Sequence, residues 1–158
     1  MGDWINRLKE QEAAARREQE QRETAQLRQH DLIATKGPHA WEKAVAQIER
    51  DVAQLRAAFP DDRAKDLQFA RCDGGFALER HAYPQVLLRA RWQPEINGVG
   101  IETSFRRLAM GDTEGPRKDE IRFSLTGEGD VRMGFDGRGH TAPETLSEAL
   151  IMKVIGRV

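Results

Sequence analysis

The chain has 158 residues with 25 basic and 26 acidic side chains, and its formal net charge at pH 7 is -1. This length fits one domain of ordinary size. The near-neutral balance argues against bulk electrostatic attraction to nucleic acid or to an anionic membrane surface. Charged residues make up 32% of the chain, and most of this excess over typical domains lies in the first third.

Cysteine usage and hydropathy indicate a compartment. The chain has one cysteine, Cys72, which cannot form an internal disulfide. We therefore expect a cytoplasmic protein, because disulfide frameworks belong to oxidising compartments. Residues 1–8 lead directly into a charged run, so we expect no secretory signal. No apolar stretch approaches the ~20 residues that span a bilayer, and we expect no membrane partner.

Residues 1–36 predict an extended helical arm. Residues 9–31 are mainly Glu, Gln, Arg and Ala, which favour helix, and no proline or glycine interrupts residues 4–35. Gly37 followed by Pro38 is typical of one helix ending and the next beginning. We therefore expect two helices that meet at this dipeptide.

The arm has almost no apolar face. Its apolar residues lie near its two ends, and residues 16–23 are wholly polar. Trp4, Ile5 and Leu8 form a cluster at the tip. One interpretation is a solvated arm, since a polar helix has no tertiary anchor. The other is an arm whose tip binds a second molecule or a second copy through these three residues.

The second expected helix, residues 38–59, carries a continuous apolar stripe. The steps between its apolar residues alternate four and three, so they share one helix face. The stripe consists of Trp41, Val45, Ile48, Val52, Leu55 and Phe59. A tight helical hairpin with the arm would cover only its first half, because polar arm residues would face Val52 and Leu55.

Two bodies could cover the second half of the stripe. One is the sheet that follows, since a helix buries its apolar stripe against another layer. The other is a second copy, because Val45 and Val52 take a positions while Ile48 and Leu55 take d positions of a two-stranded coiled coil. The pattern lasts under three heptads, shorter than a typical coiled-coil signal.

From residue 67 onward the hydrophobic period changes to two, which predicts an antiparallel meander of about six strands. A loop is expected at residues 111–119. The expected strands lie near residues 67–70, 76–79, 85–92, 101–105, 121–125 and 131–135. One face of such a sheet is apolar and must be covered.

The other face of the sheet is rich in arginine. It carries Arg89, Arg91, Arg106, Arg122 and Arg132, together with Glu79, His81 and Glu102. A guanidinium offers a planar fork that matches carboxylate or phosphate, so this face is a candidate for binding anions or nucleic acid. The alternative is a solvated face with cross-strand Arg/Glu pairs.

Residues 141–158 predict a final helix that packs on the apolar side of the sheet. The expected fold is therefore α+β, with an extended arm at residues 1–36 and a two-layer domain at residues 37–158. The histidines and the cysteine lack metal-ligand spacing, so we expect no metal and no cofactor.

These features favour a non-enzymatic module for protein–protein interaction or self-assembly, with a protein partner or a second copy bound through the N-terminal helices. Two alternatives remain open. The arginine face could bind anions or nucleic acid. Glu79 and His81 share a strand face and, with Arg89 or Arg91, could form the acid/base cluster of an enzyme or a small-molecule site.

Overall fold

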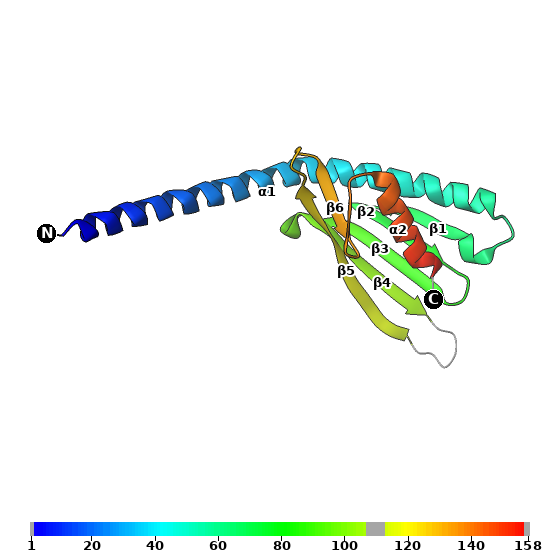
Figure 1. The fold of residues 1–158 in the computed structure, drawn as a ribbon. Helices are drawn as coiled ribbons and strands as arrows, with labels where there is room; N and C mark the ends of the chain where they lie inside the picture. The colour runs from blue at the N-terminus through cyan, green and yellow to red at the C-terminus, as the bar shows by residue number, and fades with distance from the viewer. Residues whose placement is uncertain (1, 107–112, 157–158) are drawn as a thin grey trace. The chain divides into compact units, whose positions relative to one another are not determined.

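The computed structural model describes residues 2–106 and 113–156, except for the side chains of residues 106 and 113–115. The fold is α+β, as predicted: a long helix, an antiparallel sheet and a C-terminal helix (Figure 1). The helices are α1 (Asp3–Ala58) and α2 (Pro143–Ile155); the strands are β1 (Leu67–Cys72), β2 (Gly75–Arg80), β3 (Gln85–Gln93), β4 (Gly98–Arg106), β5 (Thr113–Leu125), β6 (Val131–Phe135) and β7 (Arg138–His140). The chain divides into two compact units, Met1–Leu32 and Ile33–Val158.

The expected break at Gly37 and Pro38 is wrong. Helix α1 continues through both residues, so there is no helical hairpin. Gly37 is buried, and a Cβ placed on it would lie 2.6 Å from Cη2 of Trp92. The glycine therefore lets the helix pass close to the sheet, and it does not end the helix. Pro38 costs this helix one backbone hydrogen bond without stopping it.

The sheet has seven strands in the order of the chain, each antiparallel to the next. The short strand β7 was not predicted. Strand β5 begins at Thr113, so the predicted loop at 111–119 is wrong from residue 113 onward, while residues 111–112 lie outside the described residues. The register shifts between Thr103 and Phe105, which places Gly115 and Pro116 together opposite Ser104. Such a bulge accommodates proline inside a strand.

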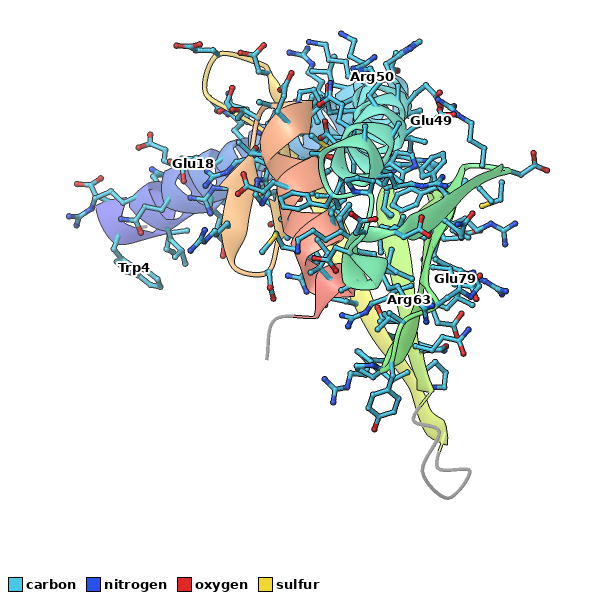
Figure 2. All side chains as sticks on the ribbon, turned by 90° about the vertical axis from the view of Figure 1, so that its right-hand side faces the viewer. Trp4, Glu18, Glu49, Arg50, Arg63 and Glu79 are labelled. Atoms are coloured by element: carbon cyan, nitrogen blue, oxygen red, sulfur yellow. The ribbon has the colours of Figure 1, made fainter. Side chains whose placement is uncertain are left out.

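Helix α2 and the part of α1 in the second unit cover the same face of the sheet, and the other face is open (Figure 2). The indole Nε1 of Trp41 donates a hydrogen bond to the carbonyl of Gly74 at 2.7 Å, and its ring stacks on Phe76. At the edge, Nε of Arg71 lies 3.0 Å from Oε2 of Glu49. Burial of the stripe therefore positions α1 on β1 to β3.

The sheet and α2 together cover the apolar stripe of α1. Trp41, Val45, Ile48 and Val52 are buried in the core, which leaves no seam there for a coiled coil with a second copy. Three positions of α2, Leu146, Leu150 and Val154, are fully buried in the same core. Leu55 is only partly buried, and Phe59 remains 47% exposed beyond the helix end.

Helix α2 is shorter than the predicted range of 141–158. It ends at Gly156, whose φ of 71° is left-handed, and residues 157–158 lie outside the described residues. The guanidinium of Arg80, almost completely buried, donates hydrogen bonds to the carbonyls of Ile155 and Tyr83. A cation at this position satisfies the last carbonyls of the helix and its negative dipole end.

Candidate functional site

The first candidate site is the tip of the first unit. Trp4 is 62% exposed and Leu8 is 46% exposed, and both lie on the same side of α1 because they are four residues apart. Ile5 beside them is half-buried. The structure thus brings the three predicted tip residues together, and the Trp4 side chain points into solvent (Figure 2).

The rest of the first unit has no core. Among its described residues no side chain is buried, and only Ile5 and Ala13 reach intermediate exposure. Side-chain hydrogen bonds within it are local, such as Thr24 Oγ1 to the carbonyl of Glu20 at 2.8 Å. Leu27 is also exposed, at 64%, but has no neighbouring aromatic residue on its face. Within residues 2–32, the tip is therefore the exposed apolar cluster that contains a tryptophan.

The second candidate site is the open face of the sheet. The strand register places Arg89 between Ala77 and Glu102, with Lys118 next in the row. A second row runs from Gly75 through Arg91 and Gly100 to Glu120. A third row consists of Gln93, Gly98, Arg122, Gly134 and Gly139. In the second and third rows each arginine therefore has a glycine on both sides.

Four of the predicted arginines share this face. Arg89 and Arg91 lie on β3, Arg122 on β5 and Arg132 on β6, opposite Ser124. Arg106 lies opposite Gln85 at the end of β4, and its side chain is outside the described residues. A Cβ on Gly139 would lie 1.9 Å from Nε of Arg132, so the guanidinium of Arg132 lies flat over that glycine.

Two adjoining hollows lie on this face. One, of about 720 Å³, is lined by Arg89, Arg91, Gly100 and Glu102, among others. The other, of about 760 Å³, is lined by Arg122, Arg132, Gly134 and Gly139, among others. They share Lys118, Asp119 and Glu120. Both hollows are open and combine charges of both signs.

Several cations of this face have no acidic partner. Nε of Arg122 lies 2.9 Å from Oε1 of Glu120. Among the residues that the structure describes, Arg89, Lys118 and Arg132 make no ion pair within 4.0 Å. These three cations are exposed and therefore free to meet an anion from outside.

Glu79 and His81 lie close together, away from the two hollows described above. Nδ1 of His81 is 3.6 Å from Oε1 of Glu79, which also accepts a hydrogen bond from Gln85 at 3.1 Å. The His81 side chain is 59% exposed. Neither residue lines the two hollows.

His140 is a buried titratable residue that was not singled out in the sequence. Oγ1 of Thr145 donates to the carbonyl of Ala142, so it accepts from Nδ1 of His140 at 3.0 Å. Nε2 therefore carries the lone pair, and it is buried without a partner among the described residues. Burial, and then the charge of Arg138, lower the pKa of His140 below its ordinary value. Burial therefore favours the neutral imidazole, which suits a structural role.

The sequence does not predict that Gly98, Gly100 and Lys118 belong to the open face, because the expected strand begins at residue 101 and residue 118 falls in the expected loop at 111–119. Gly98 and Gly100 are spaced by two residues in phase with Glu102, and this spacing was the signal that they lie on one strand face.

Within residues 2–106 and 113–156 no group of three or more His, Cys, Asp or Glu side chains is placed to hold a metal ion. No helix in the described part of the chain combines the length and apolarity needed to cross a membrane. Comparison with protein-family models, with curated proteins and with solved structures finds no match to this chain.

Proposed function

We propose that this chain is a non-enzymatic interaction protein that binds a protein partner or a second copy through the tip of its first unit. The second unit, with its shared helix–sheet core, is the folded base of this module. The proposal includes the cytosol as the compartment, because Cys72 is the only cysteine and is exposed.

The observation that carries the proposal is the exposure of Trp4 beside Leu8 on the first-unit part of α1, where no described side chain is buried. Tryptophan is enriched at the energetic centres of interfaces, where it fills a desolvated pocket. A helix that buries nothing in its own unit gains no tertiary stability from apolar residues. Contact with another molecule is what would bury Trp4 and Leu8.

The test is sedimentation velocity over a range of protein concentrations, with and without candidate partners. Replacing Trp4 and Leu8 together by alanine should abolish association. The matched control replaces Leu27 and Leu32 by alanine, since these leucines are also exposed on α1. Equal association of both variants would contradict the proposal, because it would show that the tip is not the binding site.

A second candidate function is anion binding at the open face. The observation that favours it is the set of exposed cations without acidic partners, Arg89, Lys118 and Arg132, around the two hollows. Guanidinium groups bind phosphate and carboxylate oxygens in pairs. Glu102 and Glu120 on the same face disfavour a long uniform polyanion.

The anion-binding candidate is tested by fluorescence anisotropy with a labelled oligonucleotide and, separately, with inorganic phosphate as competitor. Binding should weaken as salt increases, and Arg89→Ala with Arg91→Ala should flatten the salt dependence. Arg63→Ala with Arg56→Ala is the matched control, since both arginines lie outside the sheet. Unchanged anisotropy at low salt would reject this function.

A further inference from the structure

An apolar groove lies between the two helices of the second unit. The helices meet where Ser147 Oγ donates a hydrogen bond to Oδ2 of Asp51 at 2.6 Å. From there their C-terminal ends separate, as Figure 1 shows. The space between them, about 360 Å³, is lined by five apolar residues: Leu55, Ala58, Ile151, Met152 and Ile155. Leu55, Met152 and Ile155 are only partly buried, so the groove is open to a ligand.

The groove has one acidic residue on each wall. Asp51 belongs to α1 and Glu148 to α2, and both line the groove. Glu148 is exposed and makes no ion pair with any residue of the described ranges. Asp51 accepts hydrogen bonds from the neutral side chains of Gln47 and Ser147, so its charge is not neutralised. The site is therefore apolar inside and negative on both walls.

The tip of the first unit has the complementary pattern. With about 100° of rotation per residue, Trp4, Ile5 and Leu8 fall within one sector of roughly 100°. Arg7 and Lys9 lie roughly 100° to either side of the centre of that sector. The apolar face is therefore flanked by one cation on each side. Glu12 falls in the same sector one turn further on, so the matching segment is confined to the tip.

We infer that the tip of one copy docks in the groove between α1 and α2 of a second copy. Trp4, Ile5 and Leu8 cover the partly buried Leu55, Met152 and Ile155, and Arg7 and Lys9 face Asp51 and Glu148. This inference rests on the proposed function and names its partner. The contact is small, so we expect association in the micromolar range.

The decisive test mixes two damaged copies of the full chain. One carries Trp4→Ala with Leu8→Ala and keeps its groove, and the other carries Met152→Arg and keeps its tip. Each alone should associate at least about thirtyfold more weakly than the unmodified chain, because interface anchors are typically worth that much. Their mixture should regain a heterodimer, since one tip and one groove remain. The second copy is labelled at Cys72, which lies on the open face, and is followed by fluorescence-detected sedimentation.

A charge swap tests the same contact without touching its apolar centre. Glu148→Lys should weaken association by about three- to tenfold, because a charge at the rim of an interface mainly affects encounter and register. Adding either Arg7→Glu or Lys9→Glu to the same chain should restore it in the variant whose new carboxylate faces Lys at position 148, because the other cation still faces Asp51. Glu148 is exposed, so this variant remains informative if Met152→Arg fails to fold.

The outcomes separate the inference from the proposed function. A heterodimer in the mixture, together with rescue by the charge swap, supports docking in the groove. A monomeric mixture, or groove variants that associate as the unmodified chain does, overturns it. In that case the Trp4→Ala, Leu8→Ala variant decides the proposed function alone: loss of association or partner binding keeps it, and no loss removes it.

Discussion

The two units of the chain form helix for different physical reasons. In the second unit, α1 is fixed by burial: Trp41, Val45, Ile48 and Val52 are 3% exposed or less. In the first unit the same helix has no buried side chain among its described residues. There the helix depends on the propensity of Glu, Gln, Arg and Ala.

The difference shows that two parts of one helix can differ in their resistance to local unfolding. A packed helix resists local opening because opening exposes its core, whereas an unpacked helix opens at little cost. Exposed apolar residues consequently differ in meaning between the units. Phe59, beyond the end of the packed helix, retains a contact with the Lys65 ammonium 4.6 Å from its ring centre. Trp4 and Leu8 instead lie on the part of α1 in the first unit, where no described side chain is buried.

The largest expected effect separates the two units by stability. Ile48→Ala removes a fully buried side chain and should lower the free energy of unfolding by about 2–5 kcal/mol. Leu27→Ala, at a position 64% exposed, should change it by less than about 0.5 kcal/mol. Urea denaturation measures both. Similar losses would mean that Leu27 is packed in solution and that the first unit, like the second, is stabilised by burial.

The next effect concerns Gly37. In an exposed helix, glycine to alanine stabilises by up to about 1 kcal/mol. At Gly37 we expect the opposite sign, a loss of about 1–3 kcal/mol, because the new methyl group would overlap the Trp92 ring. Thermal or urea denaturation gives the sign. Stabilisation by this substitution would show that α1 does not lie this close to the sheet.

A smaller loss is expected where the two helices of the second unit meet. Ser147→Ala removes the hydrogen bond to Asp51 and should cost about 1 kcal/mol. Thr126→Ala is a comparison at a partly buried position, where the hydroxyl accepts a hydrogen bond from the backbone N–H of Asp130 at 3.1 Å and makes no bond to a carboxylate. If Ser147→Ala proved neutral in urea denaturation, the junction at the closed end of the groove would not be held by this bond.

The smallest effect is a pH dependence from His140. The pKa of His140 is lowered in the folded chain, by burial first and by Arg138 second. The unfolded chain takes up this proton at about pH 6.5 and the folded chain only at lower pH. Stability is therefore complete above about pH 6.5 and falls as the pH drops below it. Between about pH 7 and about pH 5.5, the urea midpoint of His140→Gln should fall less than that of the unmodified chain. Equal falls in the two proteins would exclude His140 as the cause of the pH dependence.

Much of the fold was predictable because its signals are periodic. The four-and-three spacing of Trp41 to Val52 identified the packed face, and the alternation from Leu67 onward identified most strands. The same alternation placed Arg89, Arg91, Arg122 and Arg132 on one face. These patterns are local, so no knowledge of distant contacts was needed.

The errors occurred where a local signal is overridden by a distant partner. Gly37 and Pro38 have the form of a helix boundary, but the sheet requires a glycine opposite Trp92. Pro116 is typical of a loop, but the bulge opposite Ser104 accommodates it in β5. The groove between α1 and α2 depends on the angle between two helices, and the wide apolar face of α2 was its only trace in the sequence.

Hydrogen–deuterium exchange at low and high protein concentration tests the central claim most directly. We expect the amides near Ile48 to exchange slowly at both concentrations, because they belong to the core. Amides of the first unit should exchange rapidly in dilute solution, and those near Trp4 and Leu8 should become protected at high concentration. Equal protection of the tip at both concentrations would show that it is ordered within its own chain and would contradict the account.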